Sequence, residues 1–300
     1  MNKLLGYKDT VCVVTGVSSG MGKACAEELI ELGAKVYGLD VVPVQIVGVN
    51  NFIKVNMGNK DSIDEAFSKL PEKIDRFFGF AGVSGEKTSP QETICINFLG
   101  NKYIMDHYLR SRIQENGAVM MCTSIGANRW YSSTNKPELE ALVHAKNWDE
   151  SLDVLDVICK DLPAGNAYTY SKRALGYYTT IFACEMTEKR VRVNCLKPGN
   201  TKSGLTDEFI KRYLELHPGE TVEDYHKANG MIDIAVPHQM AEPAIFLNSD
   251  MASYISGAEL TVDYAKDAAI LCGIEKEDRW IGRKLVHTCE YAENLGGKIL

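Results

Sequence analysis

The sequence has no excess of positive charge and no dense block of lysine and arginine residues. Its 300 residues include 40 acidic and 33 basic ones, which gives a formal net charge of -7. Because a nucleic-acid site needs clustered cations beside the phosphates, this balance predicts no nucleic-acid partner. A run of about 18 apolar residues is also absent, as is a charged N-terminal segment followed by a long apolar one. We therefore expect a cytoplasmic protein with no membrane partner.

Patterns typical of metal sites are missing as well. The nine cysteines form no CxxC pair and most stand in apolar runs, which predicts reduced residues of the core. The six histidines form no HxxxH or HExxH pair that would hold a metal or activate a nucleophile. The sequence thus predicts neither a metal site nor histidine chemistry.

What the sequence does contain is a regular alternation of short apolar runs and helix-patterned segments. The expected strands are 11–15, 35–40, 51–55, 76–82, 118–124, 191–197 and 259–263. The expected helices between them are 20–32, 61–70, 91–115, 168–189 and 236–248. This order predicts an α/β fold, a Rossmann-type doubly wound parallel sheet in a single domain. We assign that domain to residues 1–265 and regard 266–300 as a C-terminal extension without an assigned role.

Three glycines, Gly16, Gly20 and Gly22, separate the first expected strand from the first expected helix. A glycine-rich turn that runs into a helix presents unpaired N–H groups where a pyrophosphate can bind. Glycines also occur in ordinary turns, because those turns need positive φ angles. Asp40 favours a nucleotide site, since an acid at the end of the second strand can accept hydrogen bonds from both adenosine ribose hydroxyls.

The residues around this acid favour NAD(H) over NADP(H). Asp40 would repel a 2′-phosphate, and Ser19 occupies the position at which a basic residue would hold that phosphate. The residues after Asp40 are VVPVQ, without lysine or arginine. We therefore expect NAD as the cofactor.

The segment TGVSSGMG (15–22) resembles the TGxxxGxG loop of the short-chain dehydrogenases/reductases. Six further segments follow in the order typical of that family: NMG (56–58), FAGVSG (80–85), INFLG (96–100), CTSIG (122–126), YTYSK (168–172) and KPGNTKS (197–203). Together they cover nearly the whole chain, which is identified as a member of the family on this basis. The resemblance implies an NAD(H)-dependent oxidoreductase.

In YTYSK, Tyr168 and Lys172 are four residues apart and share one face of a helix. An ammonium close to a phenol favours the phenolate, so we expect Lys172 to lower the pKa of Tyr168 and make it a general acid/base. An isolated YxxxK is more often a surface pair on an amphipathic helix, but the companion motifs favour catalysis. Tyr170 lies on another face and is not expected to act.

Two further residues complete a predicted catalytic tetrad. Ser124 ends an expected strand at the carboxyl edge of the sheet, where its hydroxyl can steady the substrate oxygen. Asn97 interrupts an apolar helix, in which an unpartnered amide would be costly. In the family this asparagine bends the helix and holds a water that relays protons from the lysine, whereas the alternative is an ordinary hydrogen-bonded amide of the core. The tetrad is Asn97, Ser124, Tyr168 and Lys172.

The cofactor-binding residues follow partly from the glycine loop and partly from the resemblance. The sequence departs from the family after strand four, where only Ala81 and Gly82 of Asn-Asn-Ala-Gly remain, and after strand three, where Asp-Leu/Val has become Asn56-Met57. The Asn56 carbonyl can still accept a hydrogen bond from the adenine amino group. The expected set is Gly16, Ser19, Gly20, Met21, Gly22, Asp40, Asn56, Met57, Ala81, Gly82, Tyr168, Lys172, Pro198, Gly199, Thr201 and Ser203. In this set Pro198 and Gly199 shape a turn beside the nicotinamide. Thr201 and Ser203 offer hydroxyls to the carboxamide and the pyrophosphate.

The predicted reaction is the interconversion of a secondary alcohol and a ketone. Nucleotide-sugar epimerases/dehydratases share YxxxK, but they usually show TGxxGxxG and carry a larger C-terminal substrate domain. A non-catalytic, redox-sensing NAD(H)-binding protein is the other alternative, although such a protein does not need all four tetrad groups.

Residues 127–166, between Ser124 and Tyr168, form an insertion that is far shorter in most relatives and has the pattern of two helices. We expect Asn135 to cap the first helix and Asn147 the second. The insertion either packs on the outer surface or at a subunit contact, or it walls the substrate cleft through residues at its base.

In the second case Trp130 and Tyr131 would line the cleft, together with a mobile segment at 204–230 and the tail at Trp280. With this insertion, the chain resembles the subgroup of 3α-hydroxysteroid dehydrogenases/carbonyl reductases. This resemblance implies a bulky alicyclic substrate, such as a hydroxysteroid or bile acid. We also expect the chain to form a homodimer or homotetramer.

Overall fold

The computed structural model describes residues 2–43, 51–230, 232–274, 278–281 and 284–287. Its centre is a seven-stranded sheet in the order β3-β2-β1-β4-β5-β6-β7, with every neighbouring pair parallel. The strands are β1 (Val11–Thr15), β2 (Lys35–Asp40), β3 (Asn51–Lys54), β4 (Ile74–Gly79), β5 (Ile113–Cys122), β6 (Arg192–Pro198) and β7 (Glu259–Val262). The prediction of a doubly wound α/β fold is confirmed. The chain order reverses between β1 and β4, and open sheets of this kind bind ligands at such a point.

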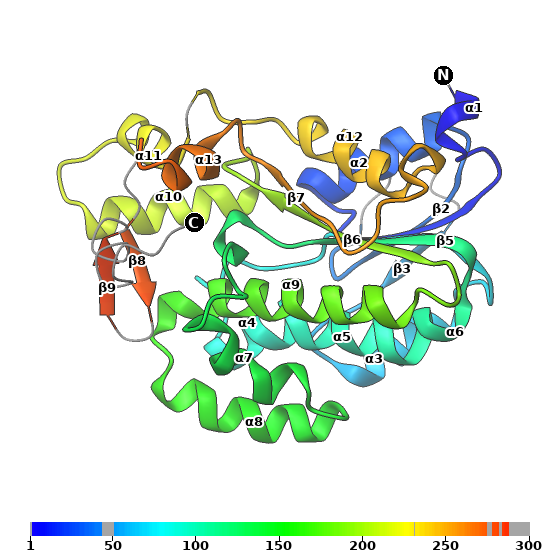
Figure 1. Ribbon diagram of the computed structural model, residues 1–300, viewed down its shortest axis with the longest axis horizontal. Helices are drawn as coiled ribbons and strands as arrows, with labels where there is room; N and C mark the ends of the chain where they lie inside the picture. Colours follow the sequence, from blue (N-terminus) through cyan, green and yellow to red (C-terminus); the bar gives the residue numbers. More distant parts are fainter. Residues whose placement is uncertain (1, 44–50, 231, 275–277, 282–283, 288–300) are drawn as a thin grey trace.

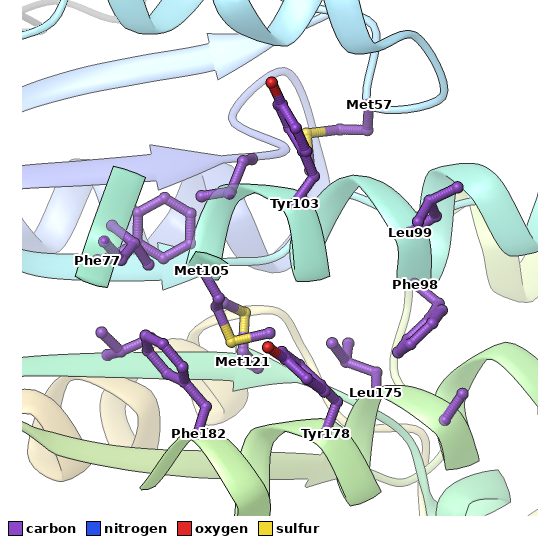
Figure 2. Packing of buried hydrophobic residues seen from close by; sticks show 14 of the residues in the cluster. Met57, Phe77, Phe98, Leu99, Tyr103, Met105, Met121, Leu175, Tyr178 and Phe182 are labelled. Atoms are coloured by element: carbon purple, nitrogen blue, oxygen red, sulfur yellow. The ribbon is translucent and has the colours of Figure 1, made fainter. Parts of the chain in front are cut away.

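Helices cover both faces of the sheet (Figure 1). One face carries α2 (Gly20–Glu31) and α12 (His238–Asn248), and the other carries α3 (Lys60–Ser68), α5 (Gly100–Ile104) and α9 (Ala167–Glu185). Successive strand residues alternate between the two faces. For example, Phe77 and Met121 pack on the side of α5 and α9, whereas Phe78 and Met120 pack on the side of α2 and α12. Figure 2 shows Phe77 and Met121 among the side chains that pack on the side of α5 and α9.

The long helix expected at 91–115 contains two π-helical turns. Its parts are α4 (Pro90–Ile94), the π turn η1 (Cys95–Leu99), α5, the π turn η2 (Met105–Leu109) and α6 (Arg110–Arg112). Ser89 begins it with a capping box, because its hydroxyl accepts from the Glu92 amide and the Glu92 carboxylate accepts from the Ser89 amide. Single π turns inside helices are frequent at functional sites, and η1 contains Asn97.

The insertion folds as two helices, α7 (Asn135–Val143) and α8 (Trp148–Asp161), which lie beyond α4 and α9 as seen from the sheet (Figure 1). Asn147 caps α8 as expected, because its side chain accepts a 2.9 Å hydrogen bond from the Glu150 amide. The expectation for Asn135 is wrong: it is the first residue of α7, and its amide donates to the Arg129 carbonyl. Assembly as a homodimer or homotetramer stays a prediction.

The remaining α-helices of the described residues are α1 (Asn2–Leu5), α10 (Gly204–Leu216), α11 (Val222–Asn229) and α13 (Lys266–Leu271). In the expected C-terminal extension, β8 (Asp278–Ile281) and β9 (Lys284–His287) pair antiparallel after α13. The side chain of Trp280, which we expected at the substrate cleft, lies outside the described part of the chain, and so does Cys289.

Five of the cysteines are buried free thiols, as expected, whereas Cys184 and Cys272 are exposed and Cys159 is half-buried. Within the described ranges, no three His, Cys, Asp or Glu side chains are grouped so that they could hold a metal ion. None of the described helices combines the length and the apolar character that crossing a bilayer requires.

Candidate active site

The glycine loop after β1 is built so tightly that side chains would not fit. Gly16 has φ +78°, and a Cβ atom there would lie 2.8 Å from the Ala81 nitrogen. A Cβ atom on Gly22 would lie 2.2 Å from the Gly16 carbonyl oxygen. Among the described residues, Ser19 precedes α2 without giving it a side-chain cap, so the first N–H groups of α2 stay available to a ligand. The loop therefore forms a cradle for an anion.

Asp40 lies at the end of β2 beside this loop. Its carboxylate accepts a 2.9 Å hydrogen bond from the Ser18 amide and a 3.1 Å bond from the Val42 amide. Asn56, after β3, directs its side-chain oxygen back to the Gly58 amide at 2.9 Å, which leaves one further acceptor site on that oxygen.

These residues border a cavity of about 460 Å³, the glycine-loop cavity. Its lining comprises Gly16, Ser18, Ser19, Gly20, Met21, Gly22, Asp40, Val41, Val42, Val55, Asn56, Met57, Phe80, Ala81, Gly82, Val83, Ile96, Ser203, Gly204 and Leu205. Eleven of them belong to the expected cofactor set, and no lysine or arginine is among the twenty.

A second cavity of about 360 Å³, the Tyr168 cavity, adjoins the first. Ser124 and Tyr168 line it together with Pro198, Gly199 and Thr201. Met21, Ser203 and Leu205 line both cavities, so the two share a wall. Every residue of the expected cofactor set except Lys172 thus borders one of the two cavities.

Tyr168 lies in the first turn of α9, and Ser124 is the second residue after β5. Burial raises the pKa of Tyr168 to about 12, and a hydrogen bond with the Ser124 side chain lowers it. The pKa of Tyr168 is thus raised, whereas we expected it to be lowered; Lys172 is not among the groups that shift it, and the role expected of Lys172 stays a prediction. The structure places the phenol and the serine hydroxyl at the same cavity, but desolvation of the phenolate outweighs the effect of the Ser124 hydroxyl on the pKa of Tyr168.

Lys172 is buried, with its ammonium 3.4 Å from where a Cβ atom on Gly82 would lie. Its ammonium donates a 2.9 Å hydrogen bond to the Cys122 carbonyl and lies 5.8 Å from the centre of the Tyr168 ring. Burial also lowers the pKa of Lys172 itself, because desolvation disfavours the ammonium. The lysine is therefore close to Tyr168 without contacting its hydroxyl directly.

Asn97 connects three parts of the site from the π turn η1. Its side-chain oxygen accepts from the Val83 amide at 2.8 Å, and its amide donates to the Val83 carbonyl at 3.0 Å and to the Ser171 hydroxyl at 3.1 Å. The Ser171 hydroxyl in turn donates to the Tyr168 carbonyl. The main-chain oxygen of Asn97 accepts from the Asn101 side chain at 3.0 Å. Asn97 is thus a fully bonded core amide that also lies in the distorted part of the helix.

The two hydroxyls expected at the cofactor already have partners within the chain. Thr201 donates to the Gly199 carbonyl at 3.1 Å, and Ser203 caps α10 by accepting from the Thr206 amide at 3.3 Å. A Cβ atom on Gly20 would lie 3.6 Å from the Cβ of Ser203, so Ser203 faces the glycine loop.

The sequence analysis missed an aromatic wall of the Tyr168 cavity, which α10 and α11 supply through Phe209, Tyr213 and Tyr225. The Phe209 ring lies 5.1 Å from the Tyr168 ring at 69°, an edge-to-face contact. The segment we expected to be a mobile loop is thus largely helical. The capping box Thr221-x-x-Asp224 was a sequence signal for the start of α11.

The expectation that Trp130 and Tyr131 wall the cleft is wrong. Trp130 is buried, donates a 2.9 Å hydrogen bond to Glu259 and stacks on Tyr177. Tyr131 is 63% exposed, and none of the residues of 127–166 whose side chains the structure describes lines the Tyr168 cavity. The insertion instead packs on helices behind the site, where Tyr170 donates to the Glu138 carbonyl at 2.8 Å.

Comparison with known proteins gives two matching families. Residues 12–201 match the NAD dependent epimerase/dehydratase family, and residues 157–264 match the enoyl-(acyl carrier protein) reductase family. Tyr168 and Lys172 fall inside both matched ranges.

The chain is 30% identical over 256 residues to a coniferyl-alcohol dehydrogenase of Pseudomonas sp. strain HR199, covering 84% of this chain and 94% of that one. It is 24% identical over 266 residues to a 3-alpha-hydroxysteroid dehydrogenase/carbonyl reductase of Comamonas testosteroni, covering 87% and 98%. A crystal structure of the 3-alpha-hydroxysteroid dehydrogenase of Pseudomonas sp. B-0831 with NADH matches with a TM-score of 0.71 at 20% identity, covering 89% of this chain and 100% of that one. The last likeness supports the fold alone.

Proposed function

Because the chain belongs to the short-chain dehydrogenase/reductase family, whose members are NAD(P)-dependent oxidoreductases, we propose that it interconverts a secondary alcohol and a ketone with NAD(H). One observation carries this proposal: Tyr168 and Ser124 line the same cavity, which shares a wall with the glycine-loop cavity. A proton-transfer group and a dinucleotide cradle are thus adjacent, as hydride transfer requires.

The glycine-loop cavity fits a dinucleotide. The cradle that excludes side chains at Gly16 and Gly22 would hold the pyrophosphate, together with the free N–H groups at the start of α2. Asp40 would accept hydrogen bonds from the adenosine ribose. When bound, the nicotinamide supplies the hydride acceptor or donor, and in its oxidised form it carries a positive charge.

NAD(H) rather than NADP(H) is supported by charge. Asp40 brings a carboxylate to the place of the ribose, and two backbone amides already orient that carboxylate. A 2′-phosphate there would meet this negative charge in a cavity that no lysine or arginine of the described residues lines. NADP(H) would therefore lose hydrogen bonds and gain repulsion.

In the proposed oxidation, Tyr168 as phenolate takes the proton of the alcohol while Ser124 holds the alcohol oxygen. Lys172 favours the phenolate through its charge and, by resemblance to the family, binds the nicotinamide ribose. Asn97 fastens the segment after β4 to α9 through Val83 and Ser171. In the reverse direction Tyr168 returns the proton to the carbonyl oxygen.

For the substrate we propose a bulky, ring-bearing alcohol such as a hydroxysteroid or bile acid. The Tyr168 cavity, at about 360 Å³, is within the range of roughly 300–1,000 Å³ typical of small-molecule sites. Its wall of Leu205, Phe209, Tyr213 and Tyr225 suits an apolar ring. The names of the relatives, which cover coniferyl alcohol and 3α-hydroxysteroids, favour the same kind of molecule.

The proposal is tested by a substrate panel with NAD+, in which NADH absorbance is recorded. The panel contains 3α-hydroxysteroids, bile acids, cyclohexanol, coniferyl alcohol and a nucleotide sugar, and Tyr168→Phe is the control for background. We expect turnover with a ring-bearing secondary alcohol. Turnover with coniferyl alcohol alone would keep the oxidoreductase assignment and overturn the secondary-alcohol assignment.

A second candidate, a nucleotide-sugar epimerase/dehydratase, is favoured by the match over residues 12–201. That match ends before α10 and α11, which carry the aromatic wall of the Tyr168 cavity. Conversion of a nucleotide sugar without net NADH formation would establish this candidate. A redox-sensing role would instead give NADH binding without turnover of any compound in the panel.

A further inference from the structure

The helix α10 has contacts on two sides of the site. Its N-terminal residues Ser203, Gly204 and Leu205 border the glycine-loop cavity, and Phe209 contacts the Tyr168 ring one turn further on. The position of α10 thus decides how Phe209 meets the proposed acid/base.

The helix α10 is also attached to the segment that follows β4. The Glu208 carboxylate accepts a hydrogen bond from the buried Ser84 hydroxyl and pairs with the Lys87 ammonium at 2.6 Å. One turn along, Arg212 pairs with Glu86 at 2.8 Å. Two successive turns of α10 are therefore held by one short segment.

That segment is itself firmly placed. Its preceding residue, Val83, is bonded on both its N–H and its C=O by Asn97. Gly85 has φ +91°, a conformation that favours glycine, and a Cβ atom there would lie 3.3 Å from the Thr93 hydroxyl. Ser84 and Glu86 flank this turn, and both bond to α10.

We propose that Glu208 is a positioning residue of the reaction, which fixes α10 through Ser84 so that Phe209 closes the Tyr168 cavity around the substrate. The inference rests on the proposed function.

The contacts of Glu208 differ in strength. Lys87 is 81% exposed, so its attraction is screened by solvent. Ser84 is 4% exposed, and its hydroxyl donates to a charged acceptor, which makes the stronger kind of hydrogen bond. Partial burial opposes ionisation of Glu208, but hydrogen bonds from Lys87 and Ser84 outweigh it and hold the pKa below its usual value. The carboxylate is therefore ionised throughout the neutral range.

The test compares Glu208→Ala with Glu215→Ala in the full chain. Both glutamates lie in α10, but Glu215 is paired only with Lys211 of its own helix among the contacts described, at 4.0 Å. For Glu208→Ala we expect KM for the alcohol to rise about tenfold, with KM for NAD+ changed by less than about twofold. Glu208→Gln keeps an acceptor for Ser84 and should recover most of the loss, whereas Glu215→Ala should match the wild type.

Hydrogen exchange of the amides at 207–216 gives a readout that does not depend on turnover. Glu208→Ala should speed this exchange about tenfold relative to Glu215→Ala, while the exchange of the sheet strands stays unchanged. Unchanged exchange at 207–216 would overturn the proposal, and so would an equal rise of both KM values. If the wild type turns over no alcohol, the proposed function fails, but the exchange experiment still decides whether Glu208 fixes α10.

Discussion

The Lys172 ammonium donates a 2.9 Å hydrogen bond to the Cys122 carbonyl and lies 5.8 Å from the centre of the Tyr168 ring. The lysine is thus held by the end of β5, the strand that also positions Ser124. Burial lowers the pKa of Lys172 and raises that of Tyr168, so it disfavours the charged form of each group. The pH dependence of the enzyme should reflect this balance.

Alcohol oxidation should become faster as the pH rises. Burial raises the pKa of Tyr168 to about 12, so the phenolate is the minor form at neutral pH. Below this pKa, the phenolate fraction increases about tenfold for each pH unit, and log(kcat/KM) for oxidation should rise with a slope close to one. Ketone reduction needs the protonated phenol, so its rate should fall only at alkaline pH.

Ser124→Ala should move the inflection of the plot of log(kcat/KM) against pH to higher pH, because the Ser124 hydrogen bond lowers the pKa of Tyr168. An inflection at lower pH than in the wild type would contradict this.

Removal of the Tyr168 hydroxyl should abolish most turnover. Tyr168→Phe keeps the ring and its contact with Phe209, so NADH should still bind while kcat falls about 100-fold or more. Tyr170→Phe is the matched control, since its hydroxyl donates only to the Glu138 carbonyl in the insertion. Near-normal kcat in Tyr168→Phe, measured with saturating substrate, would refute its role as acid/base.

Asp40 should set the cofactor preference. Asp40→Asn has the same shape and can still accept from the Ser18 amide, but it removes the negative charge. We expect the ratio of kcat/KM with NAD+ to that with NADP+ to fall by at least about tenfold, since repulsion of the 2′-phosphate disappears. An unchanged ratio, or a wild type that prefers NADP+, would show that Asp40 does not act in this way.

The insertion should matter for stability and not for substrate affinity. Leu155, in α8, is fully buried, and Leu155→Ala should lower the free energy of unfolding by about 2–5 kcal/mol. Val157, in the same helix, is 67% exposed, and Val157→Ala should change it by less than about 0.5 kcal/mol. Denaturant unfolding measures both values. A rise in KM for a steroid-sized alcohol in Leu155→Ala would restore the insertion to the substrate site.

The parallel sheet was predictable because strands that are buried on both faces need continuous apolar runs. Strand β5 shows the limit of that signal. It begins at Ile113, five residues before the expected start, because the polar stretch QENG hides its first part. The glycine loop and Asp40 were predictable for a similar reason: their roles depend on backbone space and charge at fixed places in the chain.

The wall of the Tyr168 cavity was not predictable from hydrophobic periodicity. A helix that borders a cavity buries few side chains against the core, and α10 and α11 bury only Thr206 and Tyr225. The sequence of α10 does have an apolar stripe, Leu205, Phe209, Tyr213 and Leu216, but periodicity alone does not tell whether such a stripe faces the core or a cavity. The position of Trp130 was hidden for another reason, since its partners Glu259 and Tyr177 are far away in the sequence.

The wall shared by the two cavities has a consequence for engineering and for divergence within the family. Substitutions at Met21, Ser203 or Leu205 act on both cavities, so a gain for a new substrate there is coupled to a change in cofactor affinity. Phe209, Tyr213 and Tyr225 border the Tyr168 cavity and not the glycine-loop cavity. A library confined to these three aromatic positions can therefore alter the range of accepted alcohols while the cofactor cradle stays intact.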